Sequence, residues 1–394
     1  MFHRVILIVL DSVGIGALPD AAAFGDGNVH TLGNVARSQG GLVLPSLGSL
    51  GLGCIESLVG VDCPRNPSGC YGKMQELSLG KDTTSGHWEM AGCPVFTAFP
   101  VYPHGFPADV VNQFEKITGY KMLGNQVASG TEIIAELGSE HIRTGYPIVY
   151  TSADSVLQIA AHEKSFGLEE LYRICQLTRE QICIGKHEVG RVIARPFVGQ
   201  PGSFTRTPNR HDYSILPPCP TVLDLLKAAD ISVIGVGKIG DIFAQRGLTQ
   251  SILTRSNHDG MEKLSALMAE QQQQGLIMVN LVEFDSHYGH RRNPAGYKQA
   301  LEEFDQDLTG LLPELAADDL LIITADHGCD PTAPGSDHTR EYVPLLVTSY
   351  GLQSLNLGVR STFADIGATI ADNFSLATAL PYGTSFLQQL VRNK

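Results

Sequence analysis

The sequence has one tryptophan among its 394 residues, and the apolar run near its amino end is too short to cross a membrane. That run, Val5–Leu10, stops at Asp11, whereas a membrane helix needs about 20 apolar residues. The amino end also lacks a signal-peptide cleavage pattern, and no low-complexity segment is present. We therefore expect a cytoplasmic protein that does not enter the membrane.

The sequence also lacks any run of lysine and arginine that could follow a nucleic-acid backbone or attach to an anionic membrane. The formal net charge of −13 argues in the same direction, so we expect no nucleic-acid partner. This acidity does not exclude a phosphate substrate, because a metal site or a few arginines can reverse the field inside one cleft.

The eight cysteines form no CxxC pair and no compact framework. They are spread over positions 54, 63, 70, 93, 175, 183, 219 and 329. A scattered set of this kind is typical of reduced thiols in a cytoplasmic protein, and we expect all eight to be reduced.

Short aliphatic runs alternate with helical patterns along the chain. The clearest helical pattern has apolar residues at positions 297, 301, 304, 308 and 311, behind Pro294. The alternation of strand and helix predicts an α/β fold with a doubly wound sheet. The runs predicted to form buried parallel strands are Val5–Leu10, Ile231–Val236, Leu276–Val282, Leu320–Thr324 and Val343–Val347.

The middle of the chain has a different pattern, which indicates a second domain. A length of 394 residues exceeds the size at which a single hydrophobic core usually keeps growing. Between residues 97 and 215 the apolar runs are shorter, and the exit segment RPFVGQPGSFTRTPNRHDY is rich in Pro, Gly and Arg. We therefore expect one core built from residues 1–96 and 216–394, with residues 97–215 inserted into it.

Three aspartates each follow a predicted strand directly: Asp11, Asp285 and Asp326. Because the carboxyl ends of parallel strands meet at one edge of a sheet, these carboxylates are expected to converge. A single Asp at a strand end is more often a helix cap, but all three strand ends carry one here. The accompanying imidazoles are those of His290, His327 and His338.

Three carboxylates and three imidazoles, without a thiolate, suit Mn²⁺, Zn²⁺ or Fe²⁺ better than Ca²⁺ or a Cys-rich zinc site. Six ligands are enough for two ions. Paired ions clamp the attacking and leaving oxygens of a phosphoryl transfer, so the pattern predicts that chemistry.

A group of hydroxyls lies in the segment GKDTTSGHWEMAG, residues 80–92. Such hydroxyls, next to glycines, an acidic residue and a His, suit a nucleophile whose pKa a metal lowers. Taken alone, a TTS triplet is typical of a turn or a helix N-cap. The residue pattern leaves Thr83, Thr84 and Ser85 open as the nucleophile.

Several segments together resemble the phosphopentomutase family of the alkaline phosphatase superfamily, and the similarity runs over essentially the whole chain. These segments are VLDSVGIG, KDTTSGHWE, YTSADSVLQIA, NRHDY, DSHYGHRRN, ADHGCDPT and SDHTRE. The resemblance implies an alkaline-phosphatase-like core with an inserted α+β cap. It implies interconversion of ribose 1-phosphate and ribose 5-phosphate, and of the 2-deoxyribose equivalents, through a phosphothreonine and a 1,5-bisphosphate.

The resemblance also implies two Mn²⁺ ions per chain and a priming sugar bisphosphate such as glucose 1,6-bisphosphate. One ion would be held by Asp285, His290 and His338, and the other by Asp11, Asp326 and His327. Spacing alone would allow His287 to replace His290, and only the family pattern prefers His290.

The family pattern also selects a nucleophile. Related cofactor-independent phosphoglycerate mutases place the nucleophilic Ser four residues before the His of SxxGH. That spacing from His87 selects Thr83, with Thr84 and Ser85 as alternatives.

For the substrate, the resemblance implies contacts from Ser152 and Asp154 to the sugar hydroxyls. The cations expected on the phosphate away from the metals are Arg191, Arg206, Arg210 and Lys238. The roles of Arg291 and Arg292 stay open between phosphate binding and anchoring of their loop.

Two other functions share these features. A phosphoglycerate mutase or a phosphohydrolase would use the same metals with a different cap. A non-catalytic metal-stabilised protein is disfavoured, because structural sites are usually closed by four protein ligands, whereas two sets of three appear here. We expect small pentose phosphates as the partners, and a monomer, because no amphipathic seam stands out.

Overall fold

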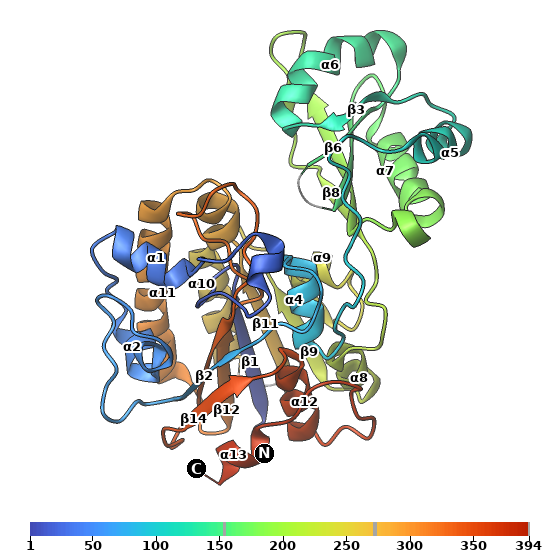
Figure 1. Cartoon of the computed structure of the whole chain (residues 1–394). Coiled ribbons are helices and arrows are strands. Elements are labelled where there is room, and N and C mark those ends of the chain that lie inside the picture. The colour runs from blue at the N-terminus through green and yellow to red at the C-terminus, as the bar shows by residue number, and fades with distance from the viewer. Residues whose placement is uncertain (153–154, 271–273, 393–394) are drawn as a thin grey trace. The chain divides into compact units, whose positions relative to one another are not determined.

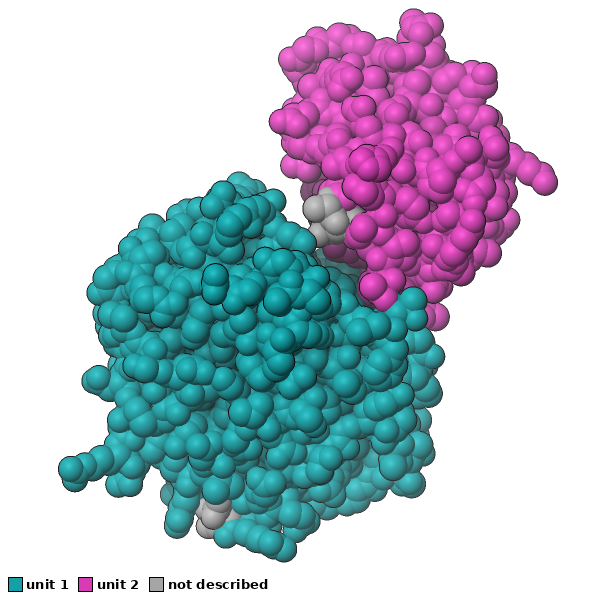
Figure 2. All heavy atoms as spheres, viewed as in Figure 1, with its two compact units in different colours: residues 1–97, 217–394 teal, residues 98–216 magenta. Residues whose placement is uncertain are grey.

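The computed structural model describes residues 1–152, 155–270 and 274–392. The chain divides into two compact units, shown in different colours in Figure 2: unit 1 comprises residues 1–97 and 217–394, and unit 2 comprises residues 98–216. The sequence-based division places these boundaries after residues 96 and 215, one residue earlier at each.

Unit 1 is built on an eight-stranded sheet with the order β10-β9-β11-β1-β12-β13-β2-β14. β1 lies between β11 and β12 and is parallel to both, and all seven of its residues are buried. The strands are β1 (Arg4–Leu10), β2 (Cys70–Met74), β9 (Ser232–Val236), β10 (Gln250–Ile252), β11 (Gly275–Leu281), β12 (Asp319–Thr324), β13 (Val343–Thr348) and β14 (Asn356–Arg360).

Each of the five predicted strands is present, but β13 is antiparallel to β12, so the expected parallel orientation is wrong for this strand. The segment between β12 and β13, residues 325–342, contains no crossover helix. Without a crossover, the chain stays at the end of the sheet where β12 finishes. The next strand therefore starts at that end and runs in the opposite direction.

Helices cover both faces of this sheet, which explains why its central strands are mainly aliphatic. α1, α2 and α10 pack with α11, whereas α4 and α8 pack with α12, and Figure 1 shows these two groups on opposite sides of the sheet. No helix among the described residues has the length and apolar character needed to cross a membrane. The helices of unit 1 are α1 (Thr31–Ser38), α2 (Pro45–Leu50), α3 (Leu52–Ile55), α4 (Thr83–Met90), α8 (Val222–Ala228), α9 (Ile239–Ile242), α10 (Asn257–Ala269), α11 (Pro294–Leu311), α12 (Ala364–Asn373) and α13 (Leu387–Val391).

Unit 2 is an α+β unit with its own core. α5 and α7 cover one face of its mixed sheet, where Phe114 and Leu157 are fully buried. α6 covers part of the other face, where its residue Ile133 packs in a cluster with Ile148 of β4 and Phe197 of β6. The elements are α5 (Ala108–Thr118), β3 (Leu123–Val127), α6 (Gly130–Thr144), β4 (Ile148–Thr151), β5 (Val156–His162), α7 (Leu168–Leu177), β6 (Arg191–Val198), β7 (Thr205–Arg206) and β8 (His211–Ser214).

Four of the eight cysteines form disulfides, Cys54 with Cys63 and Cys93 with Cys219. The prediction of eight reduced thiols is therefore wrong for these four. Cys93 and Cys219 are 126 residues apart in sequence, and the fold brings them together on the segments that leave and re-enter unit 1. The remaining thiols, at Cys70, Cys175, Cys183 and Cys329, are free and buried.

Candidate metal centre

The three strand-end aspartates lie at one edge of the unit 1 sheet. Asp11 follows β1 directly, Asp326 comes two residues after β12, and Asp285 lies in a short π-helix after β11. These three strands are neighbours and run parallel, so their carboxyl ends meet. Asp11, Asp285 and Asp326 are 2%, 8% and 0% exposed.

Asp11, Asp326 and His327 form a first group that could hold a metal ion, with ligand atoms all within 4.8 Å of one another. His327 Nε2 lies 3.4 Å from Asp11 Oδ1 and 3.6 Å from Asp326 Oδ2. Within the described chain, neither of those oxygens has a hydrogen-bond partner. Burial and the charge of Asp326 raise the pKa of Asp11, an electrostatic cost that a bound cation would remove.

Asp285, His290 and His338 form a second group around the next strand end. Asp285 Oδ2 lies 3.3 Å from His290 Nε2, and Asp285 Oδ1 lies 3.3 Å from His338 Nε2. The two Nε2 atoms are 3.1 Å apart. Although burial opposes it, His338 and His290 hold the pKa of Asp285 well below its usual range.

The two groups are contiguous, because the rings of His327 and His338 stack with centroids 3.9 Å apart. His327 also forms a metal-compatible group with Asp285 and His338. By contrast, His287 is half exposed and pairs with Glu283 at 3.3 Å, so the structure keeps it out of both groups.

Backbone carbonyls orient the three imidazoles. Nδ1 of His290 lies 2.6 Å from Ser336 O, and Nδ1 of His338 lies 2.9 Å from Lys81 O. Nδ1 of His327 lies 3.0 Å from its neighbour's carbonyl, that of Gly328. An Nδ1–H that donates to a carbonyl leaves Nε2 as the lone-pair nitrogen, which is the arrangement of metal-binding histidines. All three Nε2 atoms therefore suit a cation.

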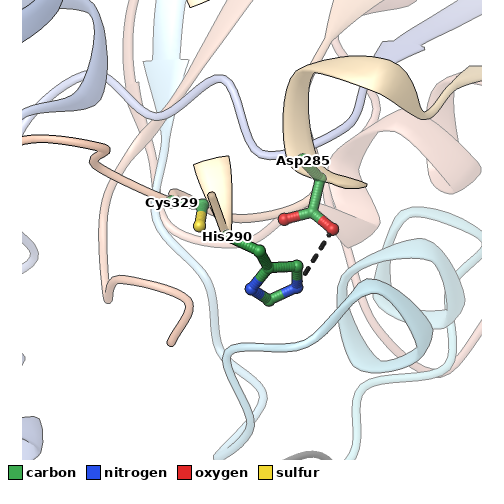
Figure 3. Close-up of side chains that lie close together, drawn as sticks. All are labelled: Asp285, His290 and Cys329. Atoms are coloured by element: carbon green, nitrogen blue, oxygen red, sulfur yellow. Dashed lines mark ion pairs between the residues drawn. The ribbon is translucent and has the colours of Figure 1, made fainter. Parts of the chain in front are cut away.

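A thiol that was not among the predicted ligands, that of Cys329, lies beside the second group. The ligand atoms of Cys329, Asp285 and His290 are within 4.8 Å of one another, and Figure 3 shows the three side chains gathered together. Burial and the nearby Asp285 raise the pKa of Cys329 well above its usual range, which favours the neutral thiol. The available signal was its position in ADHGCD, two residues after His327.

Of the three candidate hydroxyls, that of Thr83 lies at the metal-compatible groups. Thr83 is the first residue of α4, and its Oγ1 is 3.2 Å from His327 Nε2. Ser85 Oγ instead donates to Asp82 Oδ2 at 2.7 Å. The other carboxylate oxygen of Asp82 caps the helix by accepting from the backbone N–H groups of Thr84 and Ser85. Ser85 is thus occupied in the helix cap.

α4 approaches the candidate ligand Asp326 very closely. A Cβ atom on Gly86 would clash with the backbone carbonyl oxygen of Asp326, so only glycine fits there. One residue further, His87 Nδ1 lies 3.1 Å from Asp326 Oδ2 and 2.8 Å from Thr83 O. The sequence did not predict a contact between His87 and a candidate ligand, and the structure shows one.

Two further groups orient the aspartates. Asn280 Nδ2 donates to Asp11 Oδ2 at 2.9 Å, and the backbone N–H of Ser12 donates to Asp326 Oδ1 at 3.0 Å. Ser12 has a φ of 74°, in the left-handed region, and its hydroxyl bonds the buried Tyr297 hydroxyl at 3.1 Å. Neither residue carried a sequence signal, because both act through contacts with residues more than 250 positions away in the sequence.

The expected substrate residues fall in both units. Lys238 lies in unit 1, at the N-cap of α9. Ser152 follows β4 in unit 2, whereas Asp154 lies outside the described residues. The three expected arginines all lie in unit 2. Arg191 is the first residue of β6, Arg206 lies in β7 and Arg210 precedes β8.

Arg191 and Arg210 share a carboxylate, because both lie near Asp212 Oδ2, at 3.5 Å and 2.6 Å. Of the two arginines whose roles were open, Arg291 donates from Nε to Ser286 O at 3.4 Å. That contact lies within its own loop. Arg292 has a φ of 52°, in the left-handed region.

Comparison with known proteins gives a consistent result. Residues 3–378 match the family model described as the metalloenzyme superfamily. A phosphopentomutase from Caldanaerobacter subterraneus subsp. tengcongensis is 57% identical over 99% of this chain and 98% of its own length. A phosphopentomutase from Clostridium novyi is 52% identical over 100% of both chains. The solved structure of the PH0037 protein from Pyrococcus horikoshii matches 98% of this chain and 99% of its own with a TM-score of 0.51 at 13% identity, which shows a shared fold.

Proposed function

The chain belongs to the phosphopentomutase family of the metalloenzyme superfamily and is an enzyme, an isomerase, and from this premise we propose that it transfers phosphate through Thr83. The proposed reaction interconverts ribose 1-phosphate and ribose 5-phosphate, and the 2-deoxyribose equivalents. The observation that carries the proposal is the distance of 3.2 Å between Thr83 Oγ1 and Nε2 of His327, beside two contiguous groups of carboxylates and imidazoles.

The donor set fits a pair of divalent cations. We assign Asp11, Asp326 and His327 to one ion, and Asp285, His290 and His338 to the other. Carboxylate and imidazole donors suit Mn²⁺, and buried carboxylate oxygens without hydrogen-bond partners fit a cation in each group. When bound, such ions would supply electrostatic stabilisation of the transferring phosphoryl group and a lower pKa for the attacking hydroxyl.

The proposed cycle begins with Thr83 phosphorylated. The free hydroxyl of a pentose monophosphate attacks the phosphorus, the bond from Thr83 Oγ1 to phosphorus breaks, and a 1,5-bisphosphate forms. The sugar then turns over, and Thr83 Oγ1 takes its other phosphate. A bisphosphate such as glucose 1,6-bisphosphate would prime a dephosphorylated enzyme in the same way.

In this cycle the substrate residues hold the part of the sugar phosphate that does not react. We assign the sugar hydroxyls to Ser152 and Asp154. The arginine side chains suit bidentate contacts with phosphate, whereas Lys238 acts as a point charge. The cations assigned to the distal phosphate are Arg191, Arg206, Arg210 and Lys238.

Intact mass spectrometry of the protein as isolated, with peptide mapping of residues 81–92, tests the proposal. We expect one added phosphate on Thr83. Thr83→Ala should lose that phosphate and pentose phosphate isomerisation together, whereas Thr84→Ala should keep both. Phosphate mapped to another residue, or parent-level turnover by Thr83→Ala, would reject the assignment.

A substrate panel tests the reaction class. Pentose phosphates are compared with 3-phosphoglycerate and p-nitrophenyl phosphate at equal concentrations. We expect isomerisation of the pentose phosphates to dominate. Dominant phosphate release would instead identify a phosphohydrolase, and preferred turnover of 3-phosphoglycerate would identify a phosphoglycerate mutase.

A further inference from the structure

An irregular connection leads to the proposed nucleophile. Residues 75–82 join β2 to α4 and contain no helix or strand, and the next residue is Thr83. A segment of this kind has no ladder of backbone hydrogen bonds of its own, so its position depends on contacts with other parts of the fold. The position matters, because a shift of about 1 Å in a reacting group can lower a rate about 100-fold.

The guanidinium of Arg340 contacts this connection at three points. Nη1 donates to Glu76 Oε2 at 2.7 Å and to Gly80 O at 2.6 Å, and Nη2 donates to Glu76 O at 3.3 Å. The side chains of Arg340 and Glu76 are 2% and 1% exposed. A buried side chain from the segment that precedes β13 therefore holds both halves of the connection.

The same arginine lies two residues after His338, a candidate ligand of the second ion. His338 Nδ1 lies 2.9 Å from the carbonyl oxygen of Lys81, which belongs to the same connection. The backbone of Arg340 is also held, because its N–H donates to Asp26 Oδ2 at 2.9 Å. The segment that carries His338 and the connection that leads to Thr83 are thus joined by both side chains.

All five N–H groups of the Arg340 guanidinium are used within the protein. Besides the three contacts with the connection, Nε and Nη2 donate to Asp20 Oδ2 at 3.3 Å and 3.1 Å. A guanidinium has five N–H donors in a fixed planar arrangement, so no donor remains for a substrate phosphate. Arg340 therefore acts on other residues of the chain.

We propose that Arg340 is a positioning residue for the phosphoryl transfer, which holds the Thr83 hydroxyl and the His338 imidazole in place relative to each other. This inference rests on the proposed function, which assigns the transfer to Thr83 and an ion to His338. The residues assigned from the family resemblance do not include Arg340. An arginine with this role affects kcat, whereas an ion pair that only stabilises the fold does not.

Arg340→Lys tests the proposal, because it keeps the charge but offers three donors in place of five. The matched control is Arg4→Lys, since Arg4 is a buried arginine that donates to both carboxylate oxygens of Asp319, at 2.8 Å and 2.6 Å. These two residues begin β1 and β12, at the end of the sheet away from the metal-compatible groups. We expect kcat for ribose 5-phosphate to fall at least about tenfold in Arg340→Lys, with KM within about twofold of the parent and the control unchanged.

Two measurements besides turnover separate positioning from stability. The rate at which glucose 1,6-bisphosphate phosphorylates Thr83, followed by intact mass spectrometry, should fall together with kcat. The Mn²⁺ affinity, followed by electron paramagnetic resonance, should fall about tenfold. A lower thermal midpoint with all three quantities at parent level would show that Arg340 only stabilises the fold, and a raised KM with unchanged kcat would place it on the substrate. Either result would overturn the proposal.

A second variant, Asp20→Asn, decides the question if Arg340→Lys does not fold. The Asp20 side chain is 46% exposed, so the substitution loosens the guanidinium without opening the core. We expect kcat to fall about threefold at a parent-like thermal midpoint, and parent-level kcat would overturn the inference alone. No phosphate on Thr83 in the parent, even after priming, would overturn the proposed function and this inference with it.

Discussion

His87 Nδ1 lies 3.1 Å from Asp326 Oδ2, and both side chains are fully buried. The same nitrogen lies 2.8 Å from the backbone carbonyl of Thr83, one helical turn earlier in α4. A single imidazole therefore links the helix that carries the proposed nucleophile to a candidate metal ligand. Contacts of this type orient metal ligands, and their loss typically weakens metal binding 10–100-fold.

We therefore expect His87→Gln to weaken Mn²⁺ binding by about tenfold or more. Titration of the metal-free protein with Mn²⁺, followed by electron paramagnetic resonance, measures the affinity. His258→Gln is the control, because His258 is exposed on α10, where it contacts Asp307 at 3.0 Å. An unchanged affinity in His87→Gln would show that this contact does not support the metal centre.

Asp326→Asn should lower metal affinity and turnover together. The substitution removes a negative charge from the first candidate metal group, while the side chain keeps nearly the same shape. We expect turnover to fall at least about 100-fold at saturating Mn²⁺, since electrostatic stabilisation is a large part of phosphoryl transfer. Asp372→Asn, an exposed change beside Ser385, is the control. A parent-like metal requirement in Asp326→Asn would remove Asp326 from the site.

Much of unit 1 could be predicted because its central strands are buried on both faces. The five predicted strands lie within one residue of the observed bounds at each end, and the helical pattern behind Pro294 corresponds to α11. The direction of β13 could not be predicted, because a continuous apolar run looks the same in either direction. It is set by the return path of residues 325–342.

The ligand candidates had a sequence signal because each aspartate follows a strand. The contacts around them had none. His87, Asn280 and Cys329 approach the aspartates from different elements, and their distances depend on how α4 and the sheet pack.

The paired cysteines predict a definite thiol count. Alkylation of the denatured, unreduced protein should label four cysteines, Cys70, Cys175, Cys183 and Cys329, and alkylation after reduction should label eight. Mass spectrometry of the alkylated peptides provides the count. Eight labels without reduction would return all the cysteines to the reduced state expected from sequence.

We expect truncation of the Glu89 side chain to lower the free energy of unfolding strongly. Its buried carboxylate accepts hydrogen bonds from Leu77 N, Ser78 N, Ser78 Oγ, Thr362 Oγ1 and Phe363 N. Glu89→Ala leaves these donors unpaired, so we expect a loss of about 3 kcal/mol or more in the free energy of unfolding. Thermal and urea unfolding measure it, with the exposed Glu262→Ala as control. Equal stability of the two variants would contradict this role.

The buried carboxyl group of Glu341 should make the stability of the protein depend on pH. Its carboxylate accepts from the hydroxyls of Thr31 and Thr339, yet burial dominates and raises its pKa to about 7. The folded protein therefore holds this proton more tightly than the unfolded chain, whose Glu titrates near pH 4.3. The stabilisation is complete below about pH 4.3 and is lost as the pH rises through about 7, by about 4 kcal/mol in total.

The side chain that Glu341→Gln introduces is neutral at every pH, so this variant does not lose stability as the pH rises to 7. The thermal midpoint of the variant, relative to the parent, should rise steadily from pH 5 to pH 7 and stay constant above pH 8. Glu262→Gln, which removes an exposed carboxylate on α10, is the control. It shows how much the relative thermal midpoint changes with pH when a solvent-exposed carboxylate is lost. The sign is decisive, because a carboxylate whose pKa were lowered by its hydrogen bonds would make the relative midpoint fall over the same range. A flat or falling difference for Glu341→Gln would mean that the Thr31 and Thr339 hydroxyls outweigh burial.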